Sequence, residues 1–185
     1  MTTYSPAYPP AHNATYVKAT SEYSSSYAAY LATDPSKSLT GTFTGNSWDT
    51  TSYANQRFHI DLGSAKIIRR VYYENGHSSG GYTTNGAKTF TMQGSNEATA
   101  FAQLTYATDT DWTNLTTEVA QFDQHVALDQ ADPKYFLVDN IVAYRYYAFK
   151  IAISWGALEL TMRRIVLMTE YGYGTVSFIP RPIFF

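Results

Sequence analysis

Six runs of β-branched and aromatic residues, separated by clusters of Gly, Asn, Asp and Ser, constrain the fold of this chain most. In the first run, Phe58, Ile60 and Leu62 alternate with His59 and Asp61, and this period of two predicts a strand with one buried face. No helix-period segment long enough for a βαβ crossover lies between the runs. The pattern therefore predicts an all-β antiparallel sandwich or barrel with long loops gathered at its ends. The runs are FHIDLG, IIRRVYYE, KTFTMQGS, KYFLVD, RYYAFKIAIS and MRRIVLMTE.

The chain divides into one predicted domain and two tails. Its 185 residues suit a single domain. Residues 1–14 carry three prolines among small polar residues and predict an irregular N-terminal tail, while the domain spans residues 15–172. Residues 173–185 form an apolar tail with two prolines and two final phenylalanines. This tail either folds back on its own domain or docks on a neighbouring subunit or host structure.

One short helix is predicted near the N-terminus. Tyr23, Tyr27 and Tyr30 recur at four- and three-residue spacing, which is typical of a helix that buries one stripe of side chains. Pro35 disfavours helical geometry in the residue before it, so the helix should end there.

Composition and motifs exclude several classes of function. Thirteen basic and fifteen acidic residues give a net charge of −2, and no Lys/Arg run exceeds two residues, so we expect no nucleic-acid partner. The absence of cysteine excludes disulfides, thiolate zinc sites and cysteine nucleophiles. Charged residues interrupt the longest apolar segment, residues 135–154, so no membrane span is expected, and the start lacks a secretory signal pattern. No hydrolase, zinc-helix or phosphate-loop motif occurs, which predicts a protein that is not an enzyme.

Five segments match one known family in order and spacing: ATSEYSSSYAAYLATD, FHIDLGSAKIIRRVYYE, KTFTMQGSNEATAF, YRYYAFKIAISWG and RRIVLMTEYG. They resemble the discoidin family, also called F5/8 type C or galactose-binding-like domains, whose bacterial relatives include carbohydrate-binding modules attached to glycosidases. The resemblance implies a β-sandwich jelly roll of about eight strands that binds ligands with loops at one end, without catalysis. Extracellular animal members commonly join their domain ends with a disulfide, so this cysteine-free chain is more similar to the microbial or viral branch.

The resemblance also implies a structural calcium ion near the exit of the short helix, with Asp34 and Glu170 as its carboxylate ligands. Calcium takes six to eight oxygen ligands, many of which can be backbone carbonyls. The family often has Asp-Gly at this place, whereas here Asp34 is followed by Pro35. Without a metal, Asp34 would cap a turn and Glu170 would be a surface carboxylate.

Asp61 lies on the strand face opposite Phe58 and is either solvated or paired. Because an unpaired buried carboxylate is costly, we favour a structural salt bridge. The candidate partners are Arg69, Arg70, Arg163 and Arg164.

The glycine-rich loop ENGHSSGGYTTNGAK carries His77, Tyr82 and Asn85, a mixture that suits sugar recognition. An aromatic ring packs on the apolar face of a pyranose, while His and Asn exchange hydrogen bonds with hydroxyl groups. The alternative is a solvated loop with glycine turns.

Other loops add Asn46, Trp48 and Trp112 as candidate ligand-binding residues. Large aromatic side chains are mostly buried, so at least one tryptophan should belong to the core, and Trp155 is the first suspect.

Together these features predict a non-catalytic carbohydrate-binding module. Its partner would be a cell-surface or polysaccharide glycan, and weak single-site affinity would be raised by multivalent display. The module would be a subunit of a larger assembly such as a virion, for example a capsid-decoration or tail protein, and would act extracellularly or on the virion surface. The competing hypothesis is a structural protein of a capsid, tail or fibre, in which the sandwich is a scaffold for subunit contacts.

Overall fold

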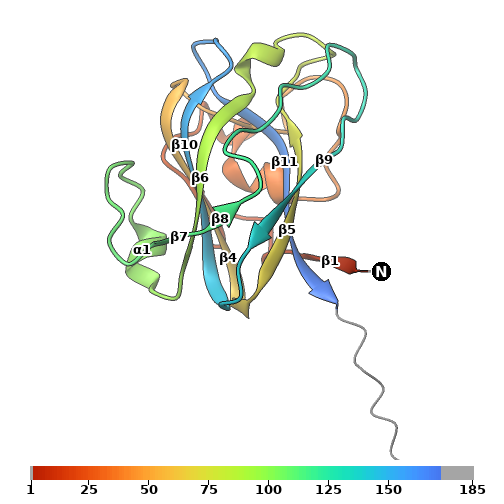
Figure 1. The fold of residues 1–185 in the computed structure, drawn as a ribbon. Coiled ribbons are helices and arrows are strands. Elements are labelled where there is room, and N and C mark those ends of the chain that lie inside the picture. The colour runs from red at the N-terminus through yellow and green to blue at the C-terminus, as the bar shows by residue number, and fades with distance from the viewer. Residues whose placement is uncertain (1, 172–185) are drawn as a thin grey trace, which may run out of the picture.

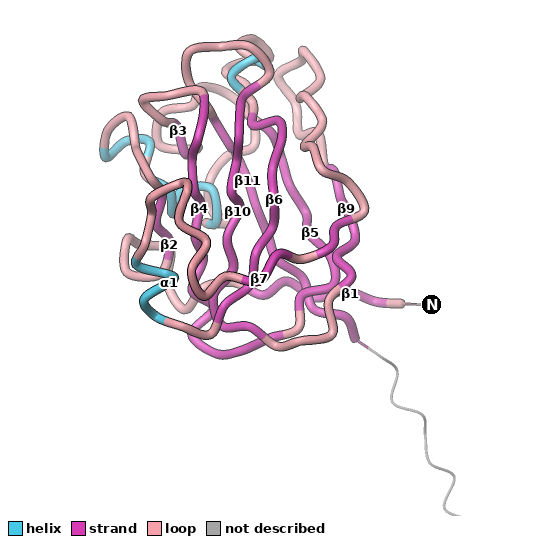
Figure 2. The backbone as a smooth tube through the Cα atoms, turned by 60° about the vertical axis from the view of Figure 1, so that its left-hand side comes forward, coloured by secondary structure: helices cyan, strands magenta, loops and turns pink. Residues whose placement is uncertain are grey.

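Two antiparallel sheets pack face to face as a β-sandwich (Figures 1 and 2), which confirms the predicted fold class. The computed structural model describes residues 2–171. One sheet has the order β1 (Thr3–Ala7), β11 (Thr161–Tyr171), β5 (Ile68–Asn75), β9 (Lys134–Asp139) and β8 (Thr116–Thr117), with β3 (Trp48–Asp49) also paired to β11. The other has the order β2 (Val17–Ala19), β4 (Ala54–Lys66), β10 (Tyr144–Ser154), β6 (Ala87–Ser95) and β7 (Thr113–Asn114).

The six predicted runs form the six long strands β4, β5, β6, β9, β10 and β11. The described residues contain eleven strands rather than about eight, because five short strands of two to five residues add pairing to the long ones. No helix within residues 2–171 is long and apolar enough to cross a membrane.

The N-terminal segment is not an irregular tail throughout. β1 pairs antiparallel with β11 from Thr3 opposite Tyr171 to Ala7 opposite Leu167. Pro6 is compatible with this pairing because β1 is an edge strand, where a missing N–H group can face away from the sheet. The predicted C-terminal tail, residues 173–185, lies outside the described residues.

The predicted N-terminal helix is two 3₁₀ helices, η1 (Ser25–Tyr27) and η2 (Ala29–Thr33). The prediction of a buried tyrosine stripe is wrong: η2 buries alanines and Leu31, while Tyr23 is 57% exposed. A five-residue α-helix, α1 (Ala98–Ala102), lies elsewhere, between β6 and β7.

Both faces of β4 are buried, not one as predicted. Phe58, Ile60 and Leu62 lie in the main core between the sheets. On the other face, His59 is fully buried and its ring lies 4.9 Å from the Trp112 ring, because α1 and the following loop cover this face. Burial lowers the pKa of His59 to about 4, so this ring is neutral at pH 7.

Asp61 forms a salt bridge, as we expected, but with a different arginine. Arg145 on β10 donates from Nε to Oδ1 at 2.8 Å and from Nη2 to Oδ2 at 2.9 Å. None of the four arginines proposed from the sequence forms an ion pair with Asp61 in the described structure. Arg145 was missed because strand register decides the pairing, and Tyr146 stands opposite Asp61.

Candidate functional site

A cleft of about 380 Å³ lies at one end of the sandwich, the upper end in Figure 1. β5 ends there and β6 begins, while β10 ends and β11 begins. Long loops and the short strand β3 bring distant parts of the sequence to this cleft. Its lining residues are Tyr23, Tyr27, Thr42, Phe43, Thr44, Asp49, Ser78, Tyr82, Asn85 and Glu159.

Aromatic rings form much of the cleft wall. Tyr82 is 71% exposed, and its ring lies edge-on to Phe43 at 6.4 Å. Tyr23 and Tyr27 form a second edge-on pair at 5.6 Å, and the Tyr27 hydroxyl hydrogen-bonds Thr44 Oγ1 at 2.9 Å. Such rings offer flat apolar faces with polar tips to a ligand.

The backbone of Tyr82 has a φ of +55°, in the left-handed region that bulky residues rarely adopt. Its carbonyl accepts from the Asn85 N–H at 3.0 Å, which closes the 3₁₀ helix η3 (Thr83–Asn85). This conformation costs on the order of 1–3 kcal/mol, and strain of this kind clusters at functional sites.

Two carboxylates face the cleft. Asp49 is 4% exposed, and its Oδ1 accepts from Thr50 N and Thr161 Oγ1, both at 2.9 Å. Burial, with a further contribution from the negative charge of Glu159, raises the pKa of Asp49 to about 6. Glu159 Oε2 accepts from Asn85 Nδ2 at 3.1 Å. Asn85, one of the predicted ligand-binding residues, therefore lines the cleft, where its amide donates to Glu159.

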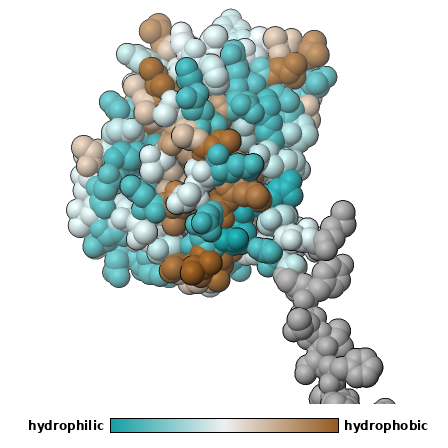
Figure 3. All heavy atoms as spheres, in the orientation of Figure 1, coloured by the Kyte–Doolittle hydropathy of each residue, from teal (hydrophilic) through white to brown (hydrophobic). Residues whose placement is uncertain are grey.

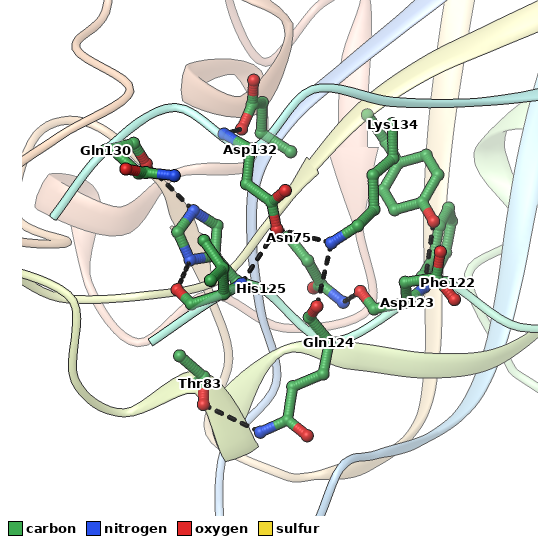
Figure 4. Close-up of polar contacts among 12 residues, drawn as sticks. Asn75, Thr83, Phe122, Asp123, Gln124, His125, Gln130, Asp132 and Lys134 are labelled. Carbon is green, nitrogen blue, oxygen red and sulfur yellow. Dashed lines mark hydrogen bonds and ion pairs between the residues drawn. The ribbon is translucent and has the colours of Figure 1, made fainter. Parts of the chain in front are cut away.

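A second set of hydrogen bonds joins the end of β5, the start of β6 and residues 123–124 at this end of the sandwich (Figure 4). Asn75 Nδ2 donates to the carbonyls of Ala87 and Asp123 at 2.7 and 2.8 Å. Gln124 Nε2 donates to Thr83 Oγ1 at 2.8 Å, which ties η3 to the loop before β9. The loop that carries Tyr82 is thus fixed to two neighbouring segments.

His77 does not belong to the cleft wall. It is fully buried, its Nδ1 accepts from Gly80 N at 3.1 Å, and its Nε2 donates to Leu39 O at 2.9 Å. Its ring also stacks on His125 with centroids 3.9 Å apart. Because both ring nitrogens are used within the protein, His77 positions loops and has no free group for a ligand.

Three other predicted ligand-binding residues are also structural. Trp48 is fully buried and packs on Phe58 at 5.0 Å, and Trp112 is 9% exposed in the cluster beside His59. Asn46 braces its own loop, since Oδ1 accepts from Ser38 N at 3.1 Å and Nδ2 donates to two backbone carbonyls. Trp155, which we expected in the core, is half-buried.

Arg163 organises the loop beside the cleft. This side chain is fully buried, and burial lowers its pKa to about 10. Its two terminal nitrogens donate to five backbone carbonyls at distances of 2.6 to 3.3 Å. The acceptors are Ser38, Thr40, Gly41, Thr42 and His77.

The proposed calcium ligands do not fit a shared site. Asp34 Oδ1 accepts from Ser36 N and Oγ at 2.9 and 2.7 Å; although burial opposes it, these bonds lower the pKa of Asp34. Glu170 instead contacts Arg69 Nε at 3.3 Å and stands opposite Tyr4 on β1. Asp34 lies within electrostatic reach of Arg164, and Glu170 lies six positions after Arg164 on β11, roughly 20 Å along the strand.

Guanidinium groups provide the positive charge in the loop where calcium was expected. Arg164 Nη2 donates to Lys37 O at 2.7 Å, next to the carbonyls held by Arg163. Within residues 2–171, no group of three or more His, Asp or Glu side chains could hold a metal ion.

Sequence reasoning missed most of the cleft. The tyrosine spacing predicts that Tyr23 and Tyr27 are buried, but both line the cleft, as do Asp49, Phe43 and Glu159, which no sequence motif marks. For Tyr23, the preceding and following polar residues in SEYSSSY were a usable sign of exposure. Glu159 and Asp49 carry no local signal, since they are 110 residues apart and meet only in the fold.

The fold is that of a β-sandwich module with a cleft among its end loops. The model of the F5/8 type C domain matches residues 16–130, more than half of the chain. The chain therefore belongs to the F5/8 type C domain family. No curated protein sequence matches it.

Solved structures share the fold at low sequence identity. A chitosan-binding module from a chitosanase/glucanase of Paenibacillus sp. IK-5 has a TM-score of 0.53 at 18% identity, covering 84% of this chain and 93% of that one. An F5/8 type C domain from Bacteroides fragilis has 0.58 at 16%, covering 84% and 91%. A family 32 carbohydrate-binding module from Clostridium perfringens, in complex with galactose, has 0.54 at 15%, covering 82% and 91%.

Proposed function

We propose that this protein binds a glycan in the end cleft and does so without catalysis. The observation that carries the proposal is the cleft itself, which is lined both by the exposed ring of Tyr82 and by the polar groups of Asn85 and Glu159. A pyranose presents an apolar C–H face and equatorial hydroxyl groups, and this pairing of ring and polar groups matches both. Membership of the F5/8 type C family and the carbohydrate-binding modules among similar structures support it.

The setting of such a module is outside a cell or on a virion surface, where cell-surface and polysaccharide glycans are accessible. The microbial branch is favoured by the absence of cysteine and by the bacterial sources of similar structures. Display in several copies would raise the affinity of a weak single site.

Replacing Tyr82 with alanine is expected to weaken retention on a glycan array by about tenfold or more, since a buried aromatic contact contributes about 1.5–3 kcal/mol. Tyr82 is 71% exposed in the free protein, so the urea midpoint should stay unchanged. Tyr135→Ala, 49% exposed on β9 and outside the cleft, is the matched control and should bind as the wild type does. Wild-type retention by Tyr82→Ala would contradict the proposed site, and shortening of the bound oligosaccharides would contradict binding without catalysis.

A second candidate function, subunit contact in a larger assembly such as a capsid, tail or fibre, is favoured by an apolar patch at the opposite end of the sandwich. Ile67, Ile141 and Val142 are 40%, 82% and 48% exposed there, and apolar residues gather at the lower edge of the face in Figure 3. Exposed apolar patches commonly mark protein contacts.

Light scattering of the purified chain tests the assembly proposal. We expect a mass above that of a single chain, and we expect Ile141→Asp to release single chains, because a charge in an apolar contact is costly. A wild-type chain that stays monomeric at all concentrations measured would argue against subunit contact through this patch.

A further inference from the structure

The cleft has a negative charge that the described protein does not neutralise. Asp49 and Glu159 are the charged residues among the described lining side chains, and both are acidic. The guanidinium groups of Arg163 and Arg164 on β11 donate to the backbone carbonyls of residues 37, 38, 40–42 and 77. Neither acid forms an ion pair with a basic side chain in residues 2–171.

Asp49 is the stronger indication of a ligand. Its Oδ1 accepts the two protein hydrogen bonds, while Oδ2 has no hydrogen-bond partner in the described structure, although the residue is 4% exposed and lines the cleft. Removing most of a carboxylate from water is unfavourable, and Oδ2 is not itself enclosed, so this oxygen can accept from a donor or a cation that enters the cleft. Burial, together with the like charge of Glu159, also raises the pKa of Asp49 to about 6, so the ionised form is unfavourable in the cleft.

We propose that the cleft selects sugars that carry a free ammonium group, that is, amino sugars that are not N-acetylated, and that Asp49 and Glu159 pair with this group. The inference rests on the proposed glycan-binding function and names the ligand class of the same site. An ammonium group has three donors and no acceptor, which suits two carboxylates that offer acceptor oxygens. The tyrosine and phenylalanine rings serve the same ligand, since they pack on its C–H face and attract its positive charge.

The test compares ligands that differ only in this charge. Wild-type protein is applied to an array of glucosamine and galactosamine oligosaccharides, together with the N-acetylated forms of each. We expect the ammonium forms to bind about tenfold tighter or more, because a hydrogen bond to a charged group contributes about 1.5–3 kcal/mol. Asp49→Asn should remove most of this preference, since Asn accepts the bonds from Thr50 and Thr161 but has no charge.

Asp139→Asn is the matched control. It removes the same charge from a side chain that is 81% exposed on β9, outside the cleft, and should leave the preference unchanged. The melting temperature of Asp49→Asn at pH 7 should not fall, because the variant removes a carboxylate whose ionisation is unfavourable in the folded state.

The possible failures are distinguishable. Equal or tighter binding of the N-acetylated sugars, or retention of other neutral glycans alone, would overturn the charge inference and leave the glycan-binding proposal standing. A preference that survives in Asp49→Asn would also overturn the inference. Binding to no glycan at all would overturn both proposals.

Discussion

Replacing Arg163 with methionine is expected to lower the free energy of unfolding by about 3–5 kcal/mol, because the variant leaves five backbone carbonyls without their donor. The side chain is fully buried, so water cannot replace the guanidinium without opening the loop. Methionine is of comparable length, which keeps the packing loss small. Urea denaturation monitored by tryptophan fluorescence would measure the change.

Arg69→Met is the control for this experiment. Arg69 is 31% exposed and contacts Asp139 and Glu170 at the surface, where ion pairs contribute about 1 kcal/mol or less. Chelation provides a second readout: since a guanidinium holds the loop, adding a chelator should leave the wild-type melting temperature unchanged. A clear fall on chelation, or an equal loss of stability in the two variants, would contradict the role given to Arg163.

Replacing Trp48 with alanine is expected to cost about 3–5 kcal/mol, the range for removing a large aromatic side chain from a core. Trp48 is fully buried, packs on Phe58 and donates from Nε1 to Ser21 O at 2.9 Å. Its loss therefore leaves both a cavity and an unpaired carbonyl. Urea unfolding and the near-UV circular dichroism of the variant would show the effect.

This experiment distinguishes two roles for Trp48: the ligand-binding role predicted from the sequence and the core-packing role seen in the structure. A ligand-binding tryptophan on a loop could be removed with the fold intact, as we expect for Tyr82, whereas a core tryptophan could not. If Trp48→Ala unfolds at the wild-type urea concentration and loses only glycan retention, then Trp48 belongs to the site after all.

The strands were predictable because their signals are local. The alternation of Phe58, Ile60 and Leu62 and the β-rich runs depend on neighbouring residues, and all six runs became strands. Burial of the opposite face of β4 was not predictable, since His59 is covered by residues 98–112, far along the chain. The edge strand β1 was missed because Pro6, with Pro9 and Pro10 shortly after it, indicates irregular backbone, whereas an edge strand accommodates a proline.

The candidate site was predicted only in part. The glycine and polar residues of their loop identify Tyr82 and Asn85 as loop residues from the sequence, and the structure places both in the cleft wall. His77 in the same loop is buried, and its neighbour in the stack, His125, is 48 residues away in the sequence. Asp49 and Glu159 come together through the pairing of β3 with β11, which no local pattern encodes.

Arg163 holds residues 38–42 through their backbone carbonyls, so the conformation of this loop depends little on which side chains it carries. Every amino acid has the same carbonyl group, so one arginine on β11 can maintain this loop through changes of its side chains, except at Gly41, whose φ of +78° favours glycine. Thr42 and its neighbours Phe43 and Thr44, which line the cleft, could then be exchanged with little effect on the backbone. Such a scaffold would allow ligand preference to diverge by single substitutions and makes residues 42–44 a natural starting point for engineering new specificities.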